Sequence, residues 1–244
     1  MIPEPTALGI LVLTAFVGSV VSGVAGFGAG IILLPVIAWV VGVRAAAPVL
    51  TVTMLIGNLA RIWWSRRHID LGVAARYLAG AVPATFIGVM VYAGTPSEWL
   101  GRFIGVFLIA AIPLRRVLLG GHVNVRLAHF PLLGGVFGVL SALVVTTGPL
   151  VTPFFLAYGL RRAAFVGTEA VCALGMHVSR GIAFTRYALI GWDTVVLGCV
   201  LGAAMFGGSW IARWVLDRMS DRVFLLTLEA LLLLMGLHFL LFPR

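Results

Sequence analysis

Long apolar runs separated by short polar stretches dominate the hydrophobic pattern of this chain. A run of about 20 apolar residues is long enough to cross a bilayer as an α-helix. In the first half the pattern predicts two segments within Leu8–Gly42, then Ala45–Trp64, Leu71–Ala93 and Trp99–Leu119. In the second half it predicts Phe130–Val145, Leu150–Leu160, Ala163–Phe184, Trp192–Leu216 and Val223–Phe242. The sequence therefore predicts an all-α polytopic membrane protein, a helical bundle with about five segments in each half.

Two stretches interrupt these runs and predict broken helices. Ser22–Gly30 is rich in glycine, and each glycine in a helix interior costs about 1 kcal/mol relative to alanine. In the second half, Thr146–Pro149 occupies the corresponding place. The helices after the breaks are expected to begin near Gly30 and Leu150. The segments on either side are short, so both re-entrant hairpins and tilted spanning helices fit them.

Matching residues recur in the same order in the two halves. The pairs are Pro35 and Pro153, Gly42-Val43-Arg44 and Gly159-Leu160-Arg161, Thr51 and Thr168, Asn58 and His177, and Arg61 and Arg180. Because each half has an odd number of segments, the second copy would enter the membrane from the opposite side. Such inverted repeats are common in secondary transporters. We expect two transmembrane repeats, residues 1–122 and 123–244, within one integral membrane domain.

Composition and charge agree with a chain embedded in lipid. The chain is 61% hydrophobic and 10% charged, whereas a soluble domain carries about 25% charged residues. Its net charge is +9, and all 17 basic residues are arginines that cluster in short loops. The positive-inside rule then predicts a multi-pass protein of the cell (inner) membrane with both termini on the non-cytoplasmic side. The sequence lacks the pattern of aromatic and basic residues that is typical of nucleic-acid binding, so no nucleic-acid partner is expected.

The two breaks provide the first candidates for an anion-binding site. Non-helical backbone at membrane depth is tolerated where protein or a watery cavity surrounds it. The N–H groups and positive dipole end of the helix after each break would face an anion. Close helix packing at a Gly26/Gly30 pair is the alternative explanation of the glycines. The candidate residues are Gly26, Gly28, Gly30, Thr146, Thr147 and Gly148.

Polar side chains on two apolar helices provide the second candidates. Asn58 and His177 lie deepest in their segments, while Arg61 and Arg180 lie nearer the ends. Ionisable groups within membrane spans are costly and usually face a cavity or a partner. These four residues are therefore candidates to coordinate a substrate, with the arginines drawing it in from either side. The alternatives are interhelical hydrogen bonds for Asn58 and His177, and snorkelling to the headgroups for the arginines.

Glu169 is a carboxylate within an apolar helix, on the same face as Arg180. Burial favours its neutral form, and a neighbouring arginine favours its charged form. Both a proton-coupling role and a structural ion pair are consistent with this position. The histidines show no metal-ligand spacing, and we expect no metal site and no cofactor. The sequence also contains no P-loop, HExxH motif or nucleophile elbow, so an enzyme is not expected.

Two motifs resemble the signatures of the sulfite exporter TauE/SafE family. The first is the glycine-rich stretch from Ser22 to Pro35, and the second runs from Thr147 to Pro153 and on through Tyr158–Thr168. The second departs from the family pattern, because Val144-Val145-Thr146-Thr147 stands where more glycine is usual. This departure favours hydroxyl donors on that side. The resemblance implies a multi-pass transporter, often an exporter, of sulfite or an organosulfonate, with proton coupling.

The sequence therefore predicts a secondary transporter that binds a small anion between the two breaks and works by alternating access. An anion channel is one alternative, and a membrane-embedded enzyme or assembly factor is another. A cation carrier would need more buried carboxylates than Glu169 and Glu229 to form a divalent site. The expected partners are a small anionic substrate and the lipid bilayer, and the sequence does not indicate an oligomeric state.

Overall fold

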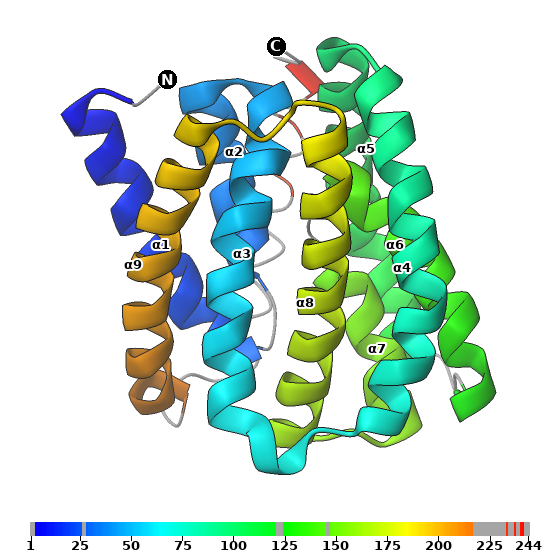
Figure 1. Cartoon of the computed structure of the whole chain (residues 1–244). Helices are drawn as coiled ribbons and strands as arrows, with labels where there is room; N and C mark the ends of the chain where they lie inside the picture. Colours follow the sequence, from blue (N-terminus) through cyan, green and yellow to red (C-terminus); the bar gives the residue numbers. More distant parts are fainter. Residues whose placement is uncertain are drawn as a thin grey trace.

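The computed structural model describes residues 3–25, 28–120, 124–144 and 147–216, with residues 233, 237, 240 and 241. Regular structure in these residues is helical, as Figure 1 shows. The first half contains α1 (Pro5–Ala25), α2 (Ala29–Val41), α3 (Val43–Ser65), α4 (Leu71–Gly94) and α5 (Ser97–Gly120). The second contains α6 (Phe130–Val144), α7 (Gly148–Tyr158), α8 (Arg162–Arg186) and α9 (Trp192–Leu216). The short 3-10 helices Arg66–His68 and Leu127–His129 precede α4 and α6. The predicted segment Val223–Phe242 lies almost entirely outside the described residues.

Six helical stretches in the described residues are long and apolar enough to cross a membrane. They lie in α1, α3, α4, α5, α6 and α9. The helix α8 has 25 residues, which at about 1.5 Å per residue also suffices for a crossing. Its charged residues make it less apolar, but it packs between α3 and α4. The prediction of an all-α polytopic membrane protein is confirmed.

Both predicted helix breaks are present. The helix α1 ends at Ala25 and α2 begins at Ala29, slightly before the expected Gly30. Between them Gly28 has a φ of 116°, a left-handed conformation that glycine adopts without a steric penalty. In the second half α6 ends at Val144 and α7 begins at Gly148. The chain therefore contains two short helices, α2 and α7, that each begin at a break.

The two broken helices end at opposite faces of the bundle. The helices α3 and α8 are antiparallel, because Gly167 of α8 lies against Ser65 of α3 and Gly181 of α8 lies near Thr51. Since α2 leads directly into the start of α3, and α7 leads into the start of α8, their C-terminal ends lie far apart. Figure 1 shows the same arrangement, with α3 and α8 side by side at the centre.

Close helix crossings occur in matching pairs in the two halves. The helix α1 packs on α9, and a methyl group added to Gly23 of α1 would collide with Ala212 of α9. The helix α6 packs on α4 in the same way, and a methyl group at Gly88 of α4 would collide with Ala142 of α6. In the first crossing the glycine is on α1 and the alanine on α9. In the second the alanine is on α6, the counterpart of α1, and the glycine is on α4, the counterpart of α9.

A second pair of crossings follows the same relation. Gly202 of α9 accommodates Ile56 of α3, and Gly175 of α8 accommodates Leu78 of α4. These crossings between the halves therefore match one another when α1, α3 and α4 are exchanged with α6, α8 and α9. This exchange is what a duplicated and inverted unit would produce. The division into repeats at residues 122 and 123 stays a prediction.

Candidate functional site

A cavity of about 50 Å³ lies where the two breaks meet α3 and α8. A buried water needs at least about 10–15 Å³ of such space, so the cavity has room for a few waters or one small polyatomic ion. Backbone from both breaks and side chains from both central helices form its wall. The two halves of the chain therefore meet around polar groups at this cavity.

Nearly all of the candidate residues from the sequence line this cavity. They are Gly28, Gly30, Asn58, Arg61, Thr147, Gly148, Glu169, His177 and Arg180. The candidates Gly26 and Thr146 lie outside the described residues. Sequence reasoning missed six further lining residues, which are Ser22, Ala29, Met54, Ser141, Ala173 and Met176. Most of these are small or apolar residues that carry no chemical signal of their own.

A constant register relates most of the lining residues of one half to those of the other. Asn58 and His177 differ by 119 positions, and adding 119 to each of five other lining positions gives another lining position. These five pairs are Ser22 and Ser141, Gly28 and Thr147, Ala29 and Gly148, Met54 and Ala173, and Arg61 and Arg180. The wall of the cavity is thus built from equivalent positions of the two halves.

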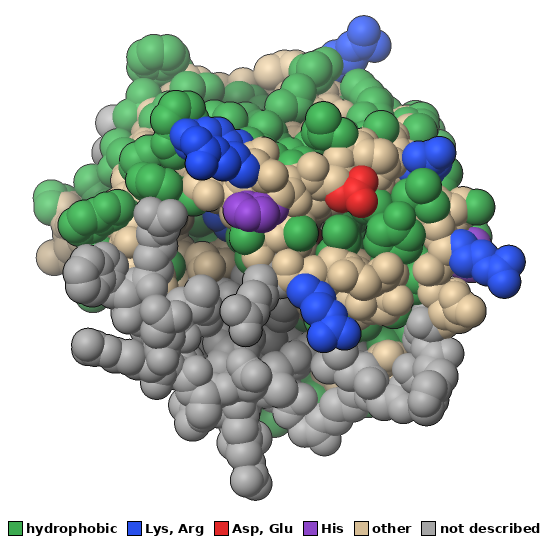
Figure 2. All heavy atoms as spheres, turned by 90° about the horizontal axis from the view of Figure 1, so that it is seen from below, with side chains coloured by type: hydrophobic (Ala, Val, Ile, Leu, Met, Phe, Trp, Pro, Cys, Tyr) green, Lys and Arg blue, Asp and Glu red, His purple; other side chains and the backbone are tan. Residues whose placement is uncertain are grey.

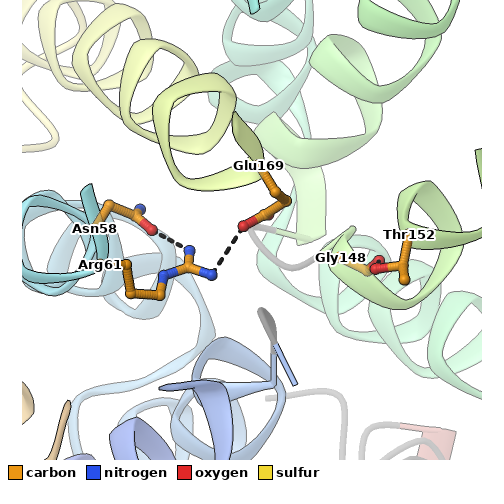
Figure 3. Close-up of polar contacts among 5 residues, drawn as sticks. All are labelled: Asn58, Arg61, Gly148, Thr152 and Glu169. Atoms are coloured by element: carbon orange, nitrogen blue, oxygen red, sulfur yellow. Dashed lines mark hydrogen bonds and ion pairs between the residues drawn. The ribbon is translucent and has the colours of Figure 1, made fainter. Parts of the chain in front are cut away.

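Arg61 connects the two central helices at the cavity. Its Nη1 atom lies 2.8 Å from Oε2 of Glu169 on α8, and its Nη2 atom donates a hydrogen bond to Oδ1 of Asn58. Figure 3 shows the guanidinium between Asn58 and Glu169. Arg61 and Glu169 are both buried, with 9% and 7% of their surfaces exposed. A buried ion pair of this kind forms where each charge compensates the other.

Arg180 makes a similar contact on α8 with different partners. Its Nη2 atom contacts Nδ1 of His177, three residues earlier, as Arg61 contacts Asn58 three residues earlier. Its Nη1 atom donates to the backbone carbonyl of Ser141 on α6. Because arginine has only donors, Nδ1 of His177 acts as the acceptor, and the imidazole is neutral. The hydrogen-bond partners of Arg180 in the described residues are therefore uncharged.

Both arginines lie inside the bundle. Arg180 is fully buried, and Arg61 is nearly so. Both lie in the last third of their helices, as expected, but their burial contradicts the alternative of snorkelling to the headgroups. The breaks explain this burial, because α2 and α7 are short and leave space at the level of Arg61 and Arg180 inside the bundle.

Two buried donors at the cavity have no hydrogen-bond partner in the described residues. They are Nδ2 of Asn58 and Nε of Arg180, and both residues line the cavity. A buried polar group without a partner costs about 1–3 kcal/mol, and more when it is charged. Since nearly all buried polar groups in proteins are paired, these two donors would stabilise a water or ligand oxygen in the cavity.

The two helix N-termini add further donors. No side chain caps α2 or α7, and the first turn of a helix leaves N–H groups without intrahelical partners. The break before α2 places Ala29 and Gly30 at the cavity. The start of α7 offers fewer groups, because Pro149 has no N–H and the N–H of Leu150 bonds to the carbonyl of Thr147. The positive end of each helix dipole favours a negative charge at this point.

The donor set suits an anion better than a metal ion. Two guanidinium groups and one carboxylate line the cavity beside a neutral histidine, so its wall is net positive. No group of three His, Cys, Asp or Glu side chains that could hold a metal ion occurs in the described residues. Positive charge, unpaired donors and helix N-termini together form a site of the kind that binds oxyanions.

Comparison with known proteins assigns the chain to a family. The model of the family described as "Sulfite exporter TauE/SafE" matches residues 11–239. Comparisons with curated proteins and with solved structures gave no match. The matched range includes both breaks, both central helices and every residue that lines the cavity. The chain therefore belongs to the sulfite exporter TauE/SafE family of membrane transporters.

Proposed function

We propose that this protein is a secondary transporter that exports a small sulfur oxyanion, either sulfite or a small organosulfonate. The observation that carries this proposal is the net positive cavity with two unpaired buried donors, Nδ2 of Asn58 and Nε of Arg180. An oxyanion has several acceptor oxygens and no need of a counter-ion here, because the cavity wall supplies the positive charge. The family supports a sulfur-containing substrate.

In this proposal each half contributes one arginine and one helix N-terminus to the same anion. Arg61 and the start of α2 belong to the first repeat, residues 1–122. Arg180, His177 and the start of α7 belong to the second, residues 123–244. Because equivalent positions line both sides of the cavity, rocking one repeat against the other would open the site to either face in turn.

The volume of the cavity limits the size of the substrate. About 50 Å³ holds an ion of a few heavy atoms and does not hold a nucleotide or another bulky molecule. Met54, Ala173 and Met176 form the apolar part of the wall. A short alkyl group of an organosulfonate could lie against them, while the sulfonate oxygens accept bonds from the donors.

We also propose that the arginine-rich face of the bundle is cytoplasmic. This face carries the exposed side chains of Arg66, Arg67, Arg76, Arg126 and Arg161. Figure 2 views the bundle from this side and shows arginine side chains spread across it. The opposite face carries Arg44, Arg102 and Arg186 together with the acidic residues Glu4 and Glu98. The positive-inside rule then places the N-terminus on the non-cytoplasmic side.

The proposal predicts ligand-dependent stability and saturable flux. Sulfite at 100 times its Kd should stabilise the purified protein by about 2.7 kcal/mol, which a thermal-unfolding assay with sulfite and small sulfonates would detect. Proteoliposomes should take up sulfite at a rate that saturates with concentration. Ohmic single-channel current would instead support an anion channel, and chemical conversion of the substrate would support an enzyme. If no sulfur oxyanion shifts the unfolding temperature or crosses the membrane, the proposal is wrong.

The left-handed glycine at the first break gives a sharper test of the anion site. Gly28→Ala should destabilise the protein by about 1–2 kcal/mol, because L-residues avoid this conformation. It should also weaken sulfite binding several-fold, since relief of the strain turns the N–H groups of Ala29 and Gly30 away from the cavity. The measurement is the apparent melting temperature with and without sulfite.

Gly159→Ala is the matched control for this variant. Gly159 has a φ of 110° at the C-terminal end of α7, away from the cavity. The Gly159→Ala variant should lose a similar amount of stability, and sulfite should still stabilise it as much as it stabilises the wild type. Equal loss of sulfite binding in both variants would contradict a role for the first break in binding.

A further inference from the structure

The charged positions of the cavity wall are symmetric except for Glu169. Glu169 lines the cavity, but the position 119 residues earlier is Leu50, a fully buried aliphatic residue. Arg61 therefore has a carboxylate partner, whereas Arg180 has the neutral partners His177 and Ser141 within the described residues. The two halves supply equivalent arginines, and only one of them is neutralised.

Resting on the proposed function, we propose that Glu169 matches the charge of the cavity to the charge of the bound anion. With Glu169 ionised, two guanidinium groups and one carboxylate give the cavity a charge of +1, which suits a monoanion such as a sulfonate. With Glu169 protonated, the charge is +2, which suits a dianion such as sulfite in its fully deprotonated form. A dianion is therefore bound together with one proton, and a monoanion is bound without one.

The physical reason is the cost of uncompensated charge inside the bundle. Charges removed from water must be paired, or the group changes its protonation state. A dianion beside the ionised Glu169 would place three negative charges against two arginines. Protonation of Glu169 removes one of them and frees the Nη1 atom of Arg61, 2.8 Å away, to donate to the anion. The proton comes from the aqueous side that loads the anion and leaves Glu169 on the side that receives it.

Few other groups near Glu169 could take up this proton. Arg61 faces it from α3, and Tyr77 of α4 and Cys172 of α8 lie close enough to interact with it electrostatically. His177 accepts from Arg180 at Nδ1, so a proton there would break that contact and place a third cation beside the two arginines. The Tyr77 hydroxyl and the Cys172 thiol already carry their protons and are neutral, so neither can take up another proton. The carboxylate is therefore the group that exchanges a proton when the anion binds.

The test measures proton uptake when two probe anions of fixed charge bind to the full-length protein. Sulfate is a dianion and methanesulfonate a monoanion throughout pH 6–8. Titration calorimetry in two buffers of different ionisation enthalpy should give one proton taken up per sulfate at pH 8 and none per methanesulfonate. The affinity for sulfate should rise up to tenfold for each unit that the pH falls, because binding is linked to one proton.

Glu169→Gln fixes the neutral form and should remove this linkage. Sulfate affinity in this variant should be independent of pH, and its preference for sulfate over methanesulfonate at pH 8 should rise at least tenfold. Glu98→Gln is the matched control, because Glu98 is exposed and paired with Arg102 at the far face. It should behave as the wild type.

The possible results separate this inference from the proposed function. Equal proton uptake for both anions in the wild type would overturn the role of Glu169, even if Glu169→Gln does not fold. Unchanged linkage in a folded Glu169→Gln variant would overturn it as well. If neither sulfate, methanesulfonate nor sulfite binds to the wild type, the proposed function itself fails.

Discussion

Replacing Arg180 by alanine should lower sulfite flux in proteoliposomes at least about 100-fold. The guanidinium is fully buried at the cavity, and its Nε atom is one of the two unpaired donors. A hydrogen bond to a charged group contributes about 1.5–3 kcal/mol, and each 1.4 kcal/mol is a factor of ten in binding. The loss of the bond from Nε to the anion, at the upper end of this range, accounts for the expected decrease. The measurement is initial uptake at a sulfite concentration well below saturation.

Arg186→Ala is the control for this change. Arg186 lies on the same helix but is exposed at its C-terminal end, so this variant should retain at least half of the flux. Arg180→Lys keeps the positive charge and loses the planar set of donors, and it should fall between the two. Flux in a folded Arg180→Ala variant that equals the wild-type value would remove Arg180 from the binding site.

Replacing Gly134 by alanine should lower the apparent melting temperature by about 6–12 °C. A methyl group at Gly134 on α6 would overlap the backbone carbonyl of Tyr77 on α4, and backbone cannot move as a side chain can. Overpacking typically costs 1–3 kcal/mol, and we expect the upper end of this range. For a chain of this size each kcal/mol corresponds to about 2–4 °C. Thermal unfolding in detergent measures the effect.

The adjacent glycine provides the control on the same helix. A methyl group at Gly135 meets nothing within 4 Å, so Gly135→Ala should be neutral or slightly stabilising through its higher helix propensity. A similar melting temperature in both variants would show that α4 and α6 are not in close contact. The matching crossing of α1 and α9 at Gly23 should respond in the same way.

The helical fold could be predicted from the sequence because lipid imposes a simple rule. A span must be helical, apolar and about 20 residues long, so the runs themselves mark the helices. Trp192–Leu216 was predicted with the bounds that α9 has. The breaks were predictable because glycine and proline interrupt helices through their own backbone preferences. The packing of α4 on α6 was not predictable. It depends on which of several glycines lies against the neighbouring helix, and the sequence does not show this.

The candidate site was predictable where chemistry is rare in a membrane. Asn58, Arg61, Glu169, His177 and Arg180 are polar residues in apolar helices, and all of them line the cavity. The sequence did not show whether the two arginines are buried or reach the headgroups, because position along a helix does not show how far the neighbouring helices extend. Ser22, Met54 and Met176 carry no such signal, and only the three-dimensional arrangement identifies them.

The contacts of Glu169 could not be read from the sequence either. The ion pair with Arg61 joins residues 108 positions apart, and no local pattern indicates that distance. The sequence indicated a carboxylate in an apolar helix with two possible roles. The structure shows the ion pair, and the proton-coupling role stays a proposal that calorimetry can test.

Two oppositely oriented helix breaks that meet within the membrane should hold an anion between them. Selenite has the shape and charge of sulfite, and its selenium atom can be located by anomalous scattering in crystals of the full-length protein. We expect one peak between Gly28–Gly30 and Thr147–Gly148, with selenite oxygens within hydrogen-bond distance of Asn58 Nδ2 and Arg180 Nε. A peak only at the exposed arginines, such as Arg66 and Arg67, or no peak at saturating selenite, would contradict it.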